Sequence, residues 1–366
     1  MDYGNIESQN TDGLTEVIYD SGEIAAAVSG IDIVNLSDVN TEYQLIHRVI
    51  GAATNGIILR FNADTDDNYG NQYMAGSNTT ESAYRSAASS WMYQSFSDVQ
   101  SGRTNFAITD IHSISGLMHT VLTKNASSIN GTTIDGVMLC GSNWNNTDEL
   151  TDLEVLDLAA HSGIGIGSRF ILLRKVVAAT DTTRAGVMNV KGKMKYAWQE
   201  VYKTTLTGTS NGITISSLTG NTDVLYRLTM RYQNANTTNS ITYLRMNNDS
   251  TANIYGCQFF EAYDTTVEAT RQTQTGVNFG HAGTNVGTSS HSQIIIYGKS
   301  GYVRPMILTE AMEIGYGSSP TCVRYMDLNG WVYNETSTEI TSMTITPSDT
   351  NGLDVGTYIC LERLNL

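Results

Sequence analysis

The chain has 366 residues, enough for two domains that each bury a core of their own. Its formal net charge of −15 disfavours direct binding to nucleic acid or to an anionic membrane, so neither is expected as a partner. Charged residues make up only 16% and there are only 3 prolines, while Thr, Ser, Asn and Gly are abundant, a composition that suits short strands joined by turns and disfavours helical bundles.

The first stretch, Met1–Gly13, is polar and carries no apolar pattern. Such a segment buries too little apolar surface to order itself, so we expect residues 1–13 to form an extended arm that lies on another subunit. We expect Met1, Tyr3 and Ile6 to make its contacts. The stretch lacks the basic and apolar regions of a signal peptide, and the apolar runs of the chain are too short to span a bilayer.

Residues 14–175 are expected to form a first domain. Ile31–Leu36, Tyr43–Ile50 and Ile57–Phe61 alternate between apolar and polar residues, as half-buried strands do. The next residues, Asn62–Asn68, are polar, and Asn and Asp favour turns because they tolerate left-handed φ and bond their own backbone. A Tyr-Gly pair then opens another extended run. This pattern predicts two strands joined by a turn.

The stretch Leu59–Tyr73, LRFNADTDDNYGNQY, has a second copy at Leu244–Phe259, LRMNNDSTANIYGCQF. Further blocks repeat in the same order: GIDIVNLS at Gly30–Ser37 with GITISSLT at Gly212–Thr219, Tyr43, Leu45 and Arg48 with Tyr226, Leu228 and Arg231, VMLCG ending at Gly141 with IIIYG ending at Gly298, and GSRFILLR at Gly167–Arg174 with GTYICLER at Gly356–Arg363. Two related domains in tandem explain this order, whereas a solenoid has shorter and more numerous units.

The spacing between the blocks predicts insertions at different places in the two copies. The first copy is longer after Asn68, and residues 77–130 hold the excess, with either a short helix or an excursion over residues 77–96. Residues 176–197 are expected to form a linker, and residues 198–366 the second domain. There we expect an inserted hairpin at about residues 299–339. Rigid aromatic side chains suit protein contacts, so a second interface is expected at Tyr302, Tyr316, Trp331 and Tyr333.

One short motif has the alternate spacing of a calcium loop, namely Asp64, Asp66 and Asn68. A hand-type calcium loop needs Gly at its sixth position and a bidentate acid at its twelfth, but these positions hold Tyr69 and Ala75. We therefore favour a structural turn and expect no metal here.

No other motif requires catalysis, and we expect neither an enzyme nor a cofactor. The glycines at 163, 165 and 167 precede a strand-like run rather than a helix, and the six histidines are scattered. Acidic pairs that meet only in space leave a carbohydrate-active enzyme as a remote alternative. Trp91, Trp144 and Trp331 could stack on sugars, although core or interface positions are favoured.

The four cysteines, Cys140, Cys257, Cys322 and Cys360, show no CxxC pairing and no zinc spacing. They stand mostly in apolar runs, where a free Cys behaves as a small hydrophobe. We expect all four to be reduced thiols in a protein that is assembled inside a cell.

LRFNADTDDNY and the closing GSRFILLRK and GTYICLERL resemble β-sandwich domains of virion structural proteins from tailed bacteriophages. The resemblance covers roughly Thr15–Lys175 and Trp198–Leu366, with Asp66 where Gly is usual. It implies an all-β fold of two tandem jelly-roll-like antiparallel sandwiches, and a structural role in the virion, which is assembled in the host cytoplasm.

Within that role, a capsid auxiliary or decoration (cement) protein is favoured, because the chain is acidic, has a polar arm and lacks a fibre-like shaft. The alternative is a tail, baseplate or fibre component that binds a host surface glycan. The expected partners are the major capsid protein or tail proteins, and further copies of the chain in a homo-oligomer such as a trimer.

Overall fold

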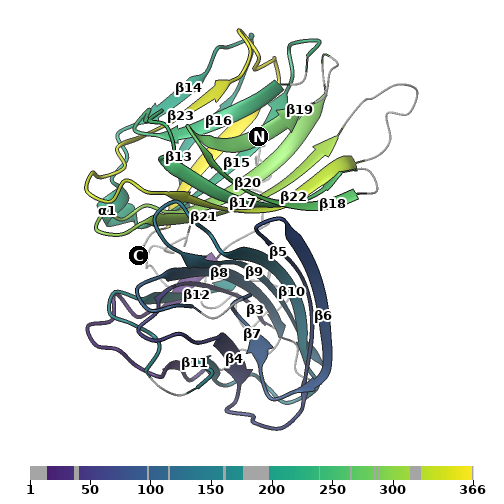
Figure 1. Cartoon of the computed structure of the whole chain (residues 1–366), viewed down its shortest axis with the longest axis vertical. Helices are drawn as coiled ribbons and strands as arrows, with labels where there is room; N and C mark the ends of the chain where they lie inside the picture. Colours follow the sequence, from purple (N-terminus) through teal and green to yellow (C-terminus); the bar gives the residue numbers. More distant parts are fainter. Residues whose placement is uncertain are drawn as a thin grey trace, which may run out of the picture.

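The computed structural model describes residues 15–36, 41–96, 99–113, 116–159, 162–175, 198–238, 240–263, 266–282, 286, 288–313, 323–364 and 366. The expected arm and linker lie outside these ranges. Apart from one helical turn, the regular secondary structure of the described residues consists of strands, arranged as two tandem antiparallel β-sandwiches (Figure 1), so the predicted all-β class is confirmed. No helix within these ranges is long and apolar enough to cross a membrane.

The first sandwich contains twelve strands, in two sheets of eight and four. They are β1 (Thr15–Asp20), β2 (Gly30–Ile33), β3 (Thr41–Ile50), β4 (Ile57–Phe61), β5 (Tyr69–Ser77), β6 (Thr80–Ser89), β7 (Met92–Tyr93), β8 (Thr104–Ser113), β9 (His119–Ile129), β10 (Gly136–Trp144), β11 (Leu153–Asp157) and β12 (Arg169–Lys175).

The second sandwich again contains twelve strands and adds one helical turn, α1 (Gly220–Asp223). The strands are β13 (Trp198–Thr205), β14 (Ile213–Ser216), β15 (Leu225–Gln233), β16 (Ser240–Met246), β17 (Tyr255–Tyr263), β18 (Thr266–Gln274), β19 (Val277–Ala282), β20 (Ser289–Tyr297), β21 (Arg304–Glu313), β22 (Val323–Tyr333), β23 (Ser342–Pro347) and β24 (Tyr358–Leu364).

The two sandwiches have the same topology. The large sheets run β1-β12-β3-β8-β9-β10-β5-β6 and β13-β24-β15-β20-β21-β22-β17-β18, and the small sheets run β2-β11-β4-β7 and β14-β23-β16-β19. Each strand of the second half therefore takes the place of the strand twelve earlier. Register agrees as well, since Tyr43 pairs with Arg174 just as Tyr226 pairs with Arg363. The repeated turn joins β4 to β5 and β16 to β17, which are equivalent positions.

One repeat block and both expected insertions are wrong. VMLCG lies on β10 and IIIYG lies on β20, whose equivalents are β22 and β8 respectively. The expected hairpin at residues 299–339 is β21 and β22, regular members of the large sheet, and residues 77–96 contain β6 and β7 rather than a helix. Short apolar strands that end in Gly resemble one another locally, so a match of five residues did not fix their topological place.

The large sheets face each other in the middle of the molecule and the small sheets lie outside, which makes four layers (Figure 1). Each sandwich has its own apolar core between its small and large sheets. A third apolar cluster joins the halves, with Ile46, Phe106, Ile108 and Val137 from the first and Leu225, Ile295, Ile307 and Val332 from the second. The two sandwiches are therefore held together by a shared core.

Close approach of the large sheets depends on glycines of the second half. A Cβ at Gly256 would lie 1.8 Å from the Thr132 carbonyl oxygen, and one at Gly330 would lie 2.6 Å from Val137. Polar contacts surround this apolar centre. Gln258 exchanges two hydrogen bonds with the Asn78 backbone, and Arg271 pairs with Asp135 at 3.6 Å.

Candidate functional site

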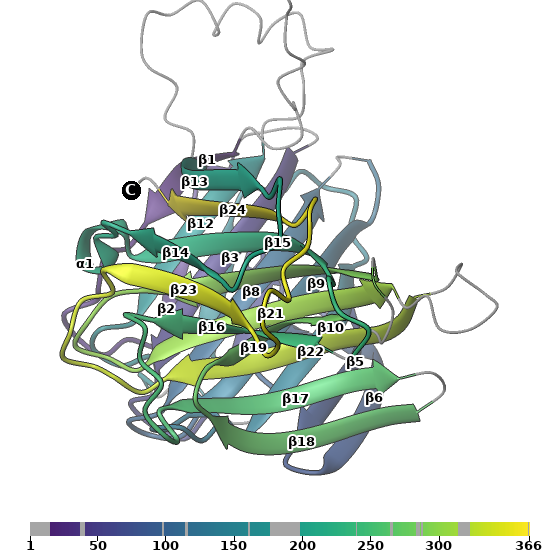
Figure 2. The same cartoon turned by 90° about the horizontal axis from the view of Figure 1, so that it is seen from above.

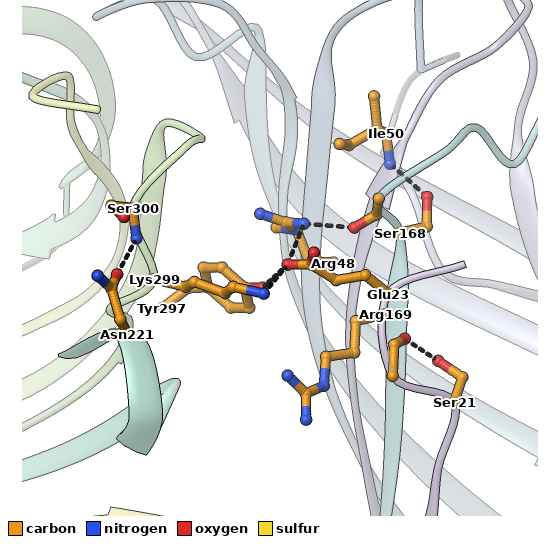
Figure 3. Close-up of polar contacts among 12 residues, drawn as sticks. Ser21, Glu23, Arg48, Ile50, Ser168, Arg169, Asn221, Tyr297, Lys299 and Ser300 are labelled. Atoms are coloured by element: carbon orange, nitrogen blue, oxygen red, sulfur yellow. Dashed lines mark hydrogen bonds and ion pairs between the residues drawn. The ribbon is translucent and has the colours of Figure 1, made fainter. Parts of the chain in front are cut away.

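Tyr302, which was expected at an interface with another protein, instead lies in a cationic cluster where the two halves of the chain meet. The buried Arg48 guanidinium lies 3.8 Å from the ring centre of Tyr302 and 4.2 Å from that of Tyr297. Figure 3 shows Arg48 and Lys299 converging on Glu23, with the Lys299–Glu23 ion pair at 2.8 Å. Burial lowers the pKa of Arg48, and the tyrosines and Glu23 oppose that shift. Tyr302 thus packs against Arg48 of its own chain.

Two further aromatic residues expected at a protein interface lie in the core instead. Trp331 and Tyr333 are fully buried in the second sandwich, with Trp331 edge-on to Phe259 and Tyr333 stacked on Tyr255. Both occupy the inward face of β22, because residues two apart on a strand point to the same side. Trp144 is buried in the same way, and Trp91 is half-buried. Met1, Tyr3, Ile6 and Tyr316 lie outside the described residues.

The Asp64 turn has the hydrogen bonds of a structural turn. The Asp64 carboxylate accepts from Trp144 Nε1 at 2.7 Å, from Asn68 Nδ2 at 3.0 Å and from the Asp66 N–H at 2.9 Å. Burial raises the pKa of Asp64, and these three donors outweigh it, so the net shift is downward. Asp249, the equivalent in the second copy, accepts from Tyr333 and Thr251.

Cys140, Cys257 and Cys360 are buried free thiols, as expected, and Cys322 lies outside the described residues. Burial raises the pKa of all three thiols, which keeps them protonated and unreactive.

An exposed edge is formed by β6 and β18, which are the last strands of their sheets. The two strands meet at one side of the molecule (Figure 2), where the Ala269 N–H of β18 donates to Glu81 of β6 at 3.1 Å. Strand β6 is exposed over most of its length and contains no Lys or Pro. Such an edge presents unpaired backbone groups that another chain can pair with.

A polar groove of about 590 Å³ lies beside this edge. Its lining is dominated by amide and charged side chains, including Asp67, Asn68, Gln72, Arg85, Asn143 and Asn145. These groups can donate and accept hydrogen bonds with a neutral polar ligand.

Each sandwich also buries a polar network that the sequence did not reveal. In the first, Gln94 follows β7 and bonds Thr109 at 2.6 Å, Thr123 at 3.1 Å and His47 at 3.3 Å. Nearby, Asn125 Nδ2 donates to Asn105 at 2.6 Å. In the second, His281 of β19 bonds Glu310, which occupies the position of Asn125. The members are distant in sequence and meet only across the sheets.

No protein-family model and no curated protein matches this chain. Among solved structures, the chain shows a weak likeness to the PBSX exported protein XepA, with 9% identity over 97% of this chain and 88% of that chain and a TM-score of 0.15. It shows a similar likeness to a tail fibre protein from a phage of E. coli, with 8% identity over 93% of this chain and 38% of that chain and a TM-score of 0.18. A Scytalido-glutamic peptidase has 11% identity over 41% of this chain and 65% of that chain, with a TM-score of 0.13. At these TM-scores, none of the likenesses carries an argument about fold or function.

Proposed function

We propose that this protein is a non-enzymatic structural component of a bacteriophage virion, and that it serves as a capsid auxiliary protein. The proposal rests on the resemblance of the repeated turn and closing strands to phage virion sandwiches. The observation that supports it best is the β6–β18 edge, because two long, largely exposed strands on one side of a four-layered body suit repeated contacts with neighbouring subunits.

Several features favour a place on the capsid over a place in the tail. The acidic chain suits a basic partner surface, and its sequence has no coiled-coil or fibre-like repeat. The expected contacts are with the major capsid protein and with further copies of this chain. The arm over residues 1–13 remains the expected second contact.

The alternative is a tail or baseplate component that binds a host glycan. The polar groove beside β6 favours this alternative, because amides and an arginine are suited to hydrogen-bonding sugar hydroxyls.

A single charged substitution tests whether the β6–β18 edge is the assembly contact. Ala83 is exposed on β6, and a Lys there opposes edge pairing without disturbing the core. We expect Ala83→Lys protein to fold normally but to be depleted from particles of the phage that encodes it, as measured by quantitative mass spectrometry of purified virions. The control is Gln72→Lys, on the exposed face of β5, a strand that is paired on both sides.

Three outcomes separate the proposals. Absence of the wild-type protein from purified particles refutes a virion role. Equal incorporation of Ala83→Lys and Gln72→Lys refutes the edge as the assembly contact. If Arg85→Ala particles incorporate the protein normally but no longer adsorb to cells, the tail alternative replaces the capsid assignment.

A further inference from the structure

His281, Glu310 and Asp327 converge inside the second sandwich. His281 lies on β19, the edge strand of the small sheet, whereas Glu310 and Asp327 lie on neighbouring strands of the large sheet. One ligand atom from each residue falls within 4.8 Å of the other two. His281 Nδ1 is 3.0 Å from Glu310 Oε2, and the His281 N–H donates to Glu310 Oε1 at 2.6 Å.

The arrangement concentrates negative charge where a sandwich usually buries apolar side chains. Glu310 stands directly opposite Asp327 on the neighbouring strand, and Asp327 stands opposite Glu261 on the strand after that, so three carboxylates form one cross-strand row. Like charges directly opposite on neighbouring strands repel, and burial strengthens the cost. Glu310 and Asp327, whose ligand atoms both lie close to His281, therefore suit a positive charge held between them.

Oxygen atoms around the cluster have unused hydrogen-bonding capacity. Asp327 is 8% exposed, and its Oδ2 accepts from Asn329 at 2.6 Å, while its Oδ1 has no hydrogen-bond partner among the described residues. Ser292 is wholly buried and stands opposite Glu310 on the same face of the sheet, and no described residue bonds its hydroxyl. Buried polar atoms are nearly always satisfied, so these point to a ligand.

A β-bulge sets the direction of the histidine. The register of β19 against β16 shifts between Thr242 and Tyr243, which leaves Phe279 as an extra residue between paired Gly280 and Asn278. Such bulges redirect side chains and are common beside functional sites. The His281 side chain keeps 17% of its surface exposed, while that of Glu310 keeps none, so solvent reaches the cluster from the histidine side.

We propose that His281 Nδ1, Glu310 and Asp327 bind one divalent transition-metal cation, Zn²⁺ or Mn²⁺. Metal–ligand bonds of about 2.0–2.2 Å place neighbouring ligand atoms about 3 Å apart, as His281 and Glu310 already are. An imidazole with two carboxylates suits these ions, whereas Ca²⁺ takes six to eight oxygens. The cation links the edge of the small sheet to the large sheet, which is a structural role.

The test uses the full-length protein after treatment with EDTA. Titration with Zn²⁺ or Mn²⁺, followed by native mass spectrometry and isothermal titration calorimetry, is expected to show one bound ion per chain and a raised melting temperature. Asp327→Asn and His281→Gln are expected to weaken binding at least about tenfold. The control is His112→Gln, because His112 faces Glu42 at 3.5 Å in an exposed pair on the first sandwich.

The wild-type titration alone can overturn the proposal: absence of stoichiometric uptake of either ion refutes the site, whatever the variants do. Equal affinity in wild-type and Asp327→Asn protein, with circular dichroism showing both folded, places any bound ion elsewhere. Loss of binding in His112→Gln with retention in His281→Gln does the same.

Discussion

In the first sandwich the polar network between the sheets is built from amides, hydroxyls and one histidine, whereas in the second it is built from a histidine and carboxylates. The two networks occupy corresponding places. Asn125 and Glu310 are equivalent, and each accepts a backbone hydrogen bond from the small-sheet side. The donor is the N–H of Phe96, two residues after Gln94, in one half and the N–H of His281 in the other. The strand framework is the same, so the chemistry between the sheets is set by side chains alone.

The two buried histidines show how strongly the surroundings matter. Burial lowers the pKa of His47 to about 4, and its hydrogen bond to neutral Gln94 opposes this only weakly. Burial also lowers the pKa of His281, but attraction to Glu310 and their hydrogen bond outweigh it and raise the value to about 9. A neutral network thus keeps its histidine neutral, and an acidic network keeps its histidine charged.

The largest expected effect comes from truncating the centre of each network. Glu310→Ala removes the acceptor of both the His281 N–H and Nδ1, which deprives the histidine cation of its main partner and should cost about 3–5 kcal/mol of stability. Asn125→Ala removes neutral hydrogen bonds and should cost about 1–3 kcal/mol. Urea unfolding of both variants measures the difference, and equal costs would show that charge does not distinguish the two sandwiches.

The next largest expected effect is a pH dependence of stability that arises in the first sandwich. His47 has a lowered pKa in the folded protein, so its contribution to stability is complete above pH 6.5 and is lost as the pH falls towards 4. Between pH 7.5 and pH 5 the expected loss is about 2 kcal/mol. His47→Gln should remove this part of the pH dependence. A variant that keeps the full wild-type slope would contradict the assignment.

Equivalent substitutions in the two repeated turns should cost similar amounts of stability, because the turns occupy equivalent places in the two sandwiches. Asn62 Oδ1 accepts from the N–H groups of Thr151 and Asp152, and Asn247 Oδ1 accepts from those of Thr341 and Ser342. Both asparagines also adopt positive φ, at 50° and 53°. Replacing either by Ala should cost about 1–2 kcal/mol. Thermal unfolding checks this, and a clear inequality would mean that the turns have diverged.

The smallest expected effect is at Asp327. Burial, and then repulsion from Glu310, raise its pKa well above the usual value. In EDTA-treated protein, Asp327→Asn relieves that repulsion and should stabilise the fold by less than about 1 kcal/mol. Chemical denaturation measures it, with Asn329→Ala as the variant that removes the neighbouring donor instead. Strong destabilisation by Asp327→Asn would show that the ionised carboxylate is needed even without a cation.

The sequence predicted the fold class and the repeated turn because these depend on local patterns. Alternation marked the strands around Leu59 and Leu244, and Asn62 and Asn247 marked the turns. The equivalence of β10 and β22 was missed because strand pairing is not encoded in a five-residue match. Alternation within β22 places Asp327, Asn329, Trp331 and Tyr333 on one face, and this signal could have identified both the core aromatics and the buried acid.

The most direct measurement is a histidine NMR titration of isotope-labelled full-length protein in EDTA, with single-histidine variants to assign the signals. If the two sandwiches differ in charge as their side chains indicate, the His47 ring stays neutral down to about pH 5 and the His281 ring stays protonated up to about pH 8. Titration of both rings near pH 6.5 would contradict the account.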